Sequence, residues 1–140
     1  MEKITITIQT TINAPIEKVW KCFTTPEDIV NWNNASDDWH TTSASNELYA
    51  GGKFNSRMEA KDGSFGFDFW GIYDEVINHE KLASTLGDGR KLETKFLPLN
   101  SKTTEIMESF EAEDENPIDM QRTGWQAILD NFKKYVEKDN

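Results

Sequence analysis

The chain has 140 residues, of which 36% are hydrophobic and 29% charged, and its formal net charge is −10. This length predicts one domain over residues 1–140. The acidic balance argues against binding to nucleic acid or to an anionic membrane surface, because both require a positively charged face. No apolar run approaches the roughly 20 residues of a membrane-spanning helix. The single Cys22 cannot form an internal disulfide, so we expect a cytoplasmic protein.

The first third of the chain predicts one strand and two short helices. Pro15 stands near the first position of a helix, where its missing N–H costs nothing, and the apolar stripe of this helix places Trp20 inward. A second start signal, Thr followed by Pro, predicts another helix over residues 25–32. Alternation of apolar and polar residues predicts a half-buried strand over residues 3–12, whose inward face carries Ile4, Ile6 and Ile8.

A polar stretch and then a meander of strands fill the middle of the chain. Residues 33–52 predict a loop with one weak strand over residues 39–48. Asp-Gly pairs in the later turns permit the positive backbone angles of tight hairpins, and the short spacings imply sequential antiparallel pairing. We place the turn before the last strand at residues 98–100. The predicted meander strands cover residues 53–60, 65–77, 81–86, 90–97 and 102–111.

A long helix is predicted at the end of the chain. Asn116 should cap it, Pro117 should take its first position, and it should run to about Glu137. A meander followed by such a helix predicts an α+β fold, in which a curved antiparallel sheet closes around the helix. The inward stripe of this helix consists of Gln121, Trp125, Ile128, Leu129, Phe132 and Val136.

Four motifs carry a resemblance to a known superfamily. Residues 11–20, TINAPIEKVW, resemble the opening motif of the SRPBCC superfamily, which includes START-like and birch-pollen-allergen-like proteins. Residues 51–54 (GGKF), 71–76 (GIYDEV) and 124–129 (GWQAIL) resemble the branch named for the activator of the heat-shock-protein-90 ATPase. The resemblance covers nearly the whole chain. It implies the helix-grip fold, with two short helices after the first strand and a hydrophobic cavity between the sheet and the long helix.

The resemblance implies little about chemistry, and no cofactor is expected. The eukaryotic co-chaperone of this branch has an additional N-terminal domain, for which this chain has no room. Many relatives end the second short helix in a Trp-Trp pair, where this chain has Trp32 and Asn33.

The inward faces of the meander strands and the helix stripe supply the candidate ligand-binding residues. Period-two alternation gives each strand one inward face, and a register slip of one would turn Met107 inward in place of Ile106. Small residues facing large ones favour a cavity over a filled core; they are Ser56, Gly71, Thr94 and Gly124. The candidates are Phe54, Met58, Phe67, Phe69, Tyr73, Phe96, Ile106, Glu108, Phe110, Trp125 and Leu129.

Glu108 stands out among these candidates because alternation places a carboxyl group inside. A buried, unpaired carboxylate is costly, so the group must be paired, protonated or hydrated. One interpretation is a polar anchor for a ligand, with a raised pKa. The other is a structural pair with a base or with a hydroxyl such as that of Tyr73. No metal site is expected, because His40 and His79 are far apart and no His or Cys cluster has ligand spacing.

Three function classes remain open. We favour noncovalent binding of a small hydrophobic or amphipathic molecule in the cavity between sheet and helix. The second class is a protein-interaction module related to the chaperone activator. The third is an enzyme of the cyclase or hydratase type that uses Glu108 and Tyr73 as acid or base. The sequence holds no catalytic motif, so a binding protein is favoured over an enzyme.

The outer face of the sheet breaks the expected polar pattern. Alternation that turns Tyr73 inward turns Trp70 and Ile72 outward, which begins an apolar patch. One interpretation is a homodimer with a symmetric interface through this patch. The alternative is that Arg57, Glu59 or the stem of a neighbouring lysine covers the indole.

Overall fold

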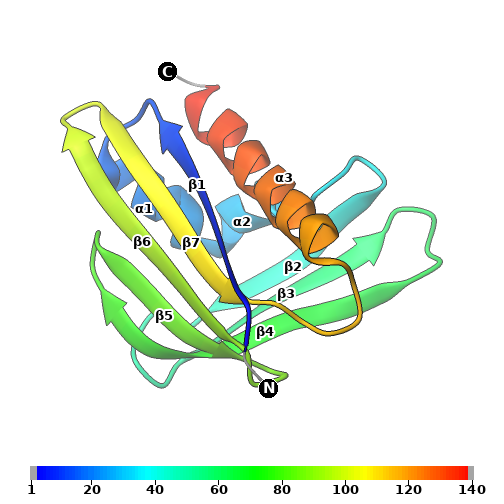
Figure 1. Ribbon diagram of the computed structural model, residues 1–140. Helices are drawn as coiled ribbons and strands as arrows, with labels where there is room; N and C mark the ends of the chain where they lie inside the picture. Colours follow the sequence, from blue (N-terminus) through cyan, green and yellow to red (C-terminus); the bar gives the residue numbers. More distant parts are fainter. Residues whose placement is uncertain (1–2, 139–140) are drawn as a thin grey trace.

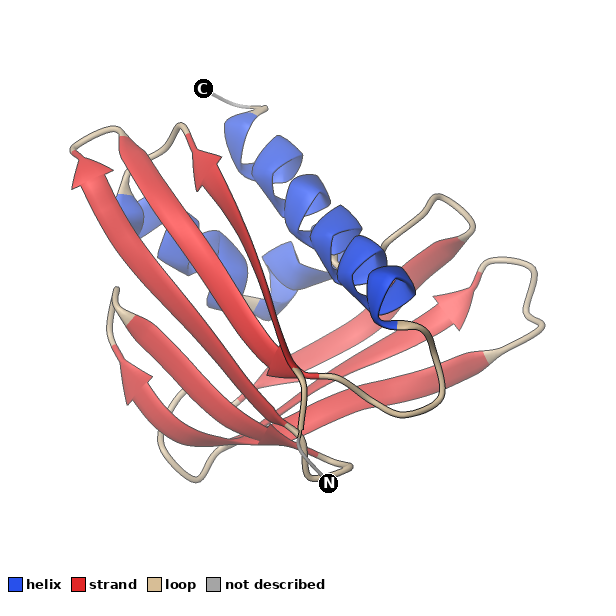
Figure 2. Cartoon of the chain, viewed as in Figure 1, coloured by secondary structure: helices blue, strands red, loops and turns tan. Residues whose placement is uncertain are grey.

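The structure, a computed structural model, describes residues 3–138. It contains one seven-stranded antiparallel sheet with the order β1-β7-β6-β5-β4-β3-β2. The sheet is strongly curved, α3 lies across its concave face, and α1 and α2 lie on the same side (Figures 1 and 2). This is the predicted helix-grip α+β fold. The elements are β1 (Thr5–Ile12), α1 (Ile16–Thr24), α2 (Pro26–Trp32), β2 (Trp39–Asn46), β3 (Lys53–Ala60), β4 (Gly66–Ile77), β5 (Lys81–Leu86), β6 (Lys91–Asn100), β7 (Thr103–Glu111) and α3 (Ile118–Glu137).

The first strand follows its alternation with one correction. Ile6 and Ile8 are buried as predicted, but Ile4 is 55% exposed, so its inward assignment is wrong. The strand begins only at Thr5, and its pairing with β7 runs from Thr5 opposite Glu111. The Ile4 carbonyl still accepts a hydrogen bond from the Ala112 N–H at 2.8 Å, so Ile4 lies at the end of the sheet, beyond the buried core.

The meander forms where its turns predict it, except near the end of β6. Gly63 and Gly89 have φ angles of +78° and +92°, which a side chain would disfavour, and both lie in turns between predicted strands. The predicted turn at residues 98–100 is wrong, because β6 continues to Asn100. Pro98 pairs with Thr104 of β7, beyond the last β5 pairing at Lys95, so no strand on the other side needs its missing N–H.

The start of α3 uses a different cap from the predicted one. Pro117 is the N-cap residue, without a side-chain cap bond, so the assignment of Asn116 as cap is wrong. The buried Gln121 secures this corner instead. Its Oε1 accepts a hydrogen bond from the Glu113 N–H at 2.9 Å, and its Nε2 donates to the Asn116 carbonyl at 2.8 Å. A glutamine one turn into the helix thus fixes the loop that leads to it.

An aromatic core fills one end of the space between the sheet and the helices. Trp20 packs edge-on against Phe96 with ring centroids 5.1 Å apart. Phe132 of α3 contacts Trp32 and Phe23 at centroid distances of 4.7 and 5.2 Å. The C-terminal half of α3 therefore packs against α1 and α2. Its N-terminal half, which includes Gly124 and Trp125, borders a cavity.

Candidate ligand-binding cavity

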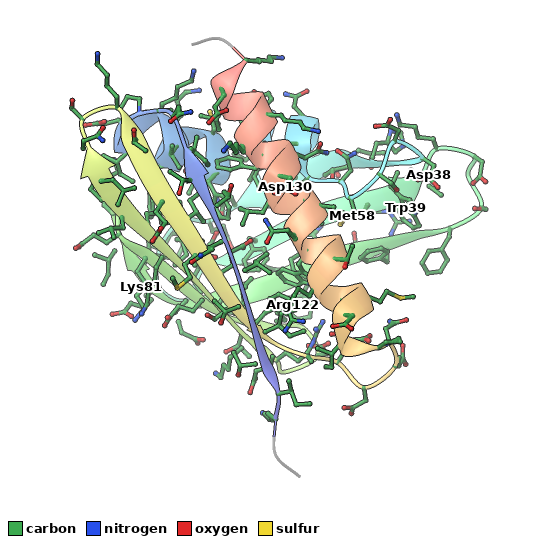
Figure 3. The ribbon with its side chains drawn as sticks, turned by 45° about the horizontal axis from the view of Figure 1, so that its top comes forward. Asp38, Trp39, Met58, Lys81, Arg122 and Asp130 are labelled. Carbon is green, nitrogen blue, oxygen red and sulfur yellow. The ribbon has the colours of Figure 1, made fainter. Side chains whose placement is uncertain are left out.

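A cavity of about 550 Å³ lies between the N-terminal half of α3 and the concave face of the sheet. Aromatic rings form much of its wall, including Phe54, Phe69 and Trp125. Trp125 stacks on Phe110 with centroids 3.9 Å apart, so its ring is held in place from behind. Met58 and Trp39, two further lining residues, are labelled in Figure 3, Met58 next to α3 and Trp39 farther from the helix.

Eight of the eleven candidate residues line this cavity, and three do not. Phe96, Ile106 and Phe110 lie in the packed core. Phe96 is covered by Trp20 and Phe23, and Phe110 is covered by the indole of Trp125. The lining candidates are Phe54, Met58, Phe67, Phe69, Tyr73, Glu108, Trp125 and Leu129.

The positions of two candidates add detail. Ile106 is fully buried on the inner face of β7, whereas Met107 lines a shallow hollow on the other face, so the register that turns Ile106 inward is confirmed. Phe67 is 39% exposed and lies against Trp39 with centroids 5.9 Å apart. Because both also line the cavity, they form part of its rim.

Three of the four small residues predicted to leave room line the cavity. They are Ser56, Thr94 and Gly124, and a Cβ atom added to Gly124 would meet no atom within 4 Å. Gly71 has another role. A Cβ atom there would lie 2.8 Å from the ring of Phe54, so the ring occupies the space that the missing side chain leaves.

Several lining residues were not among the candidates. Leu82 and Ser84 of β5 line the cavity, and the alternation in residues 81–86 carried a signal for both. Ile29 of α2 and the loop residues Ala35 and Ser36 also line it. The loop has no periodic pattern, so nothing in the sequence assigned it to the wall. Trp32 and Asn33, where many relatives have a Trp-Trp pair, line the cavity as well.

Four ionisable side chains line the cavity, and three of them have strong partners within the described residues. The Arg90 Nε lies 2.7 Å from an Asp88 carboxylate oxygen. Glu113 accepts hydrogen bonds from the backbone N–H and the side-chain amide of Asn116 at 2.7 and 2.9 Å. The Tyr73 hydroxyl donates to the Asn46 side chain at 2.6 Å, and burial raises the pKa of Tyr73 to about 12.

Glu108 is the fourth ionisable side chain, and it is nearly without partners. Only 8% of the residue is exposed, and its Oε2 accepts one long hydrogen bond of 3.3 Å from the Thr94 hydroxyl. Burial raises the pKa of Glu108 to about 7. The structural alternative of a pair with a hydroxyl is met by Thr94, whereas Tyr73 is the wrong partner, because its hydroxyl donates to Asn46. The carboxyl thus keeps acceptor capacity directed toward a cavity.

Two further features concern residues 3–138, a cluster of metal ligands and a membrane-spanning helix. No group of three or more His, Cys, Asp or Glu side chains in this range could hold a metal ion. None of the helices described there is long and apolar enough to cross a membrane.

Comparison with known proteins assigns the family. The family model described as "Activator of Hsp90 ATPase homolog 1-like protein" matches residues 13–137. The chain belongs to this family. The match confirms the resemblance, since it includes residues 51–54, 71–76 and 124–129 and residues 13–20 of the opening motif. A comparison with curated proteins found no match.

Solved structures agree with this family and its fold. The solution structure of the AHSA1-like protein from Aeromonas hydrophila is 42% identical, with a TM-score of 0.90 over 97% of this chain and 94% of that chain. A protein from Cytophaga hutchinsonii is 47% identical, with a TM-score of 0.83 over 96% of this chain and 93% of that chain. A protein from Nitrosomonas europaea is 17% identical, with a TM-score of 0.83 over 98% and 96% of the two chains, and it shows the fold alone.

Proposed function

We propose that the protein binds a small hydrophobic or amphipathic molecule noncovalently in the cavity between α3 and the sheet. The carrying observation is the cavity of about 550 Å³. The cavity opens to solvent on one side, and its volume lies within the roughly 300–1,000 Å³ that sites for small molecules span. A filled core would instead have favoured interaction through the surface. The eight lining candidates are the proposed contact residues, and the proposed setting is a single cytoplasmic domain.

The walls suit an apolar ligand that meets a prepared surface. Phe54, Phe69 and Trp125 offer broad apolar faces, and burying such area against a ligand contributes about 25 cal/mol per Å² before the costs of association. Trp125 is held by Phe110, so its position does not depend on the ligand. Such preorganisation supports binding because less side-chain freedom is lost.

Filling the cavity from the helix tests this proposal. In Gly124→Leu the new side chain enters open space on α3, and the helix loses a residue of poor helix propensity. The variant should fold and should bind the neutral, polarity-sensitive dye Nile red at least about tenfold more weakly than the wild type. Thr123→Leu, at the exposed neighbouring position on α3, should bind as the wild type does.

Two readouts decide the outcome. Equal Nile red affinity in the wild type, Gly124→Leu and Thr123→Leu would contradict cavity binding. Native mass spectrometry of protein purified from its own host should show a bound small molecule that Gly124→Leu lacks.

A chaperone-interaction module is the second candidate, and the family match favours it. A protein interaction through the surface would not need the cavity. Stimulation of an Hsp90-type ATPase that Gly124→Leu leaves unchanged would support this candidate. One observation favours the cyclase or hydratase alternative, because Tyr73 and Glu108 both line the cavity. It has less support than binding, because the Tyr73 hydroxyl is bound to Asn46 and not to Glu108.

The proposed homodimer through Trp70 and Ile72 competes with an intramolecular contact. The Lys53 ammonium lies 4.7 Å from the centre of the Trp70 ring. This contact supports the alternative in which a lysine covers the indole. The dimer and this alternative differ in the oligomeric state that they predict, and sedimentation tests them.

A further inference from the structure

A polar diagonal crosses the floor of the cavity from β4 to β7. Tyr73 lies opposite Ser84 in the β4–β5 pairing, and Thr94 lies opposite Glu108 in the β6–β7 pairing. Ser84 pairs with Leu92, two residues before Thr94, so Ser84 and Thr94 are diagonal neighbours. All four polar residues line the cavity. The diagonal therefore ends at the carboxyl group of Glu108.

The charges around the cavity leave Glu108 without a cation. Arg90 is the basic side chain among the lining residues, and it is held by Asp88 and by the Glu111 carbonyl at 3.2 Å. A carboxylate has about four acceptor positions, and Glu108 uses one of them in a long bond. A ligand with a positive charge and several N–H donors would neutralise the Glu108 carboxylate and fill its unused acceptor positions.

The aromatic wall is suited to the apolar part of such a ligand. Phe54 lies 5.3 Å from Tyr73 and 6.0 Å from Phe69, and Phe69 lies 5.8 Å from Trp125, as centroid distances. Neighbouring rings at these distances form a continuous apolar surface that a hydrocarbon chain can contact. The net charge of −10 adds a field that draws cations toward the protein and repels anions.

We propose that the ligand is an amphipathic amine, whose protonated nitrogen pairs with Glu108 and whose apolar part lies along Phe54, Phe69 and Trp125. This inference rests on the proposed binding function and specifies its ligand class. A fatty acid would place its carboxylate against that of Glu108, and like charges in a buried site repel. An alcohol of the same length would fill the same space with a weaker hydrogen bond.

The proposal implies a pH dependence of binding. The ionisable groups that face the cavity are Tyr73, Arg90, Glu108 and Glu113, and Glu108 is the one with a pKa raised to about 7. A bound ammonium favours the ionised carboxylate. The affinity for an amine should therefore rise as the pH increases through 7 and then stay level until the amine itself loses its proton.

Three probes of equal chain length test the proposal by calorimetric titration. They are octylamine, n-octanol and octanoate. The wild type should bind octylammonium at least about tenfold more tightly than n-octanol near pH 8, and this affinity should fall by up to about tenfold near pH 6. Octanoate should bind most weakly. Glu108→Gln should remove both the amine preference and its pH dependence while it keeps the affinity for n-octanol.

A matched variant and a measurement on the wild type complete the test. Glu113→Gln changes the other lining glutamate and should leave the amine preference intact, because this side chain is already bound by Asn116. In the wild type, the carboxyl carbon NMR signal of Glu108 should titrate at lower pH with octylammonium bound than with n-octanol bound. This second measurement does not depend on whether Glu108→Gln folds.

The outcomes separate the ligand class from the binding function. If n-octanol binds as tightly as octylammonium, or if Glu108→Gln keeps the amine preference, the amine proposal fails and the binding function stands. The amine proposal also fails if the Glu108 signal titrates at the same pH with octylammonium bound as with n-octanol bound. If none of the three probes binds at millimolar concentration and Nile red does not bind, both proposals fail.

Discussion

The carboxyl group of Glu108 makes the stability of the fold depend on pH, since its pKa differs between the folded and unfolded states. Burial raises the pKa from 4.5 to about 7. The folded protein therefore binds the proton more tightly than the unfolded chain does. The stability that this difference contributes is fully present below about pH 4.5. It is lost as the pH rises through 7.

Replacing this carboxyl with an amide should remove that pH dependence. The wild type should lose stability as the pH rises from about 5 to about 8, and Glu108→Gln should not. The free energy of unfolding of the variant, relative to that of the wild type, should therefore rise over this range by on the order of 3 kcal/mol. Urea unfolding of both proteins at the two pH values measures the difference. Other carboxyl groups titrate in both proteins and cancel. A constant difference between the two pH values would mean that Glu108 titrates normally.

Trp20 gives a second prediction at the scale of one residue. Its ring is 6% exposed and lies against Phe96 and His79, with centroids 5.1 and 5.8 Å away. Trp20→Ala should lower the free energy of unfolding by about 3–5 kcal/mol, because it opens a hole in a packed core. Trp70→Ala, at a 38% exposed position, is the control and should cost less. Equal losses in urea unfolding would contradict the buried role of Trp20.

Individual contacts show where prediction from sequence stops. The inward direction of Glu108 follows from alternation along one strand, and the structure confirms it. The partner of Tyr73 could not be predicted in this way. Asn46 lies in the weakly patterned second strand, 27 residues before Tyr73, and only the folded sheet brings the two together. A strand pattern fixes a direction but not the partner in another strand.

Two glycines, Gly124 in α3 and Gly71 in β4, should respond oppositely to the same substitution. At Gly124 in α3 a Cβ atom meets nothing, so Gly124→Ala should raise stability by up to about 1 kcal/mol through helix propensity. At Gly71 in β4 a Cβ atom would lie 2.8 Å from the Phe54 ring and 2.9 Å from the Thr85 carbonyl. Gly71→Ala should therefore cost about 1–3 kcal/mol.

The melting temperatures of these two variants and the wild type provide the measurement. The opposite signs follow from the surroundings of each Cβ atom, since the chemical change is identical. A gain at Gly71 would mean that the Phe54 ring moves freely into the cavity. A loss at Gly124 would mean that this face of α3 is closed.

The ends of the elements were predictable where turn residues define them. Strands β3 and β5 have the predicted limits, because glycine-containing or tight turns interrupt the pattern on both sides. The C-terminal end of β6 was not predictable in this way. Pro98 is typical of a turn, and it is tolerated in the strand only because β5 has already ended beside it. The start of α3 likewise depends on Gln121, which the helical pattern assigns to the apolar stripe.

At the scale of the molecule, the cavity results from unequal filling of the space under the sheet. Trp20, Phe23, Trp32, Phe96 and Phe132 fill the end covered by α1 and α2. At the other end, Gly124 leaves the face of α3 open. Alternation predicts which side chains turn inward, but it does not predict whether an inward side chain lines the cavity or is covered by others in the packed core. For this reason the sequence alone grouped Phe96, Ile106 and Phe110 with the lining residues.

The oligomeric state is the last prediction, and it follows from the outer face of the sheet. Trp70 keeps 38% exposure while its ring lies under the Lys53 ammonium and against Gly87. A symmetric interface would have to displace that lysine, and nearby Asp68 and Asp74 would bring like charges together across a two-fold axis. We therefore expect the wild type and Trp70→Glu to sediment as monomers at tens of micromolar. A wild-type dimer that Trp70→Glu dissociates would establish the outer face as the interface. Lys53→Met is the matched variant, because it uncovers the indole and adds apolar surface. A dimer formed only by Lys53→Met would show that this one cation keeps the patch from pairing.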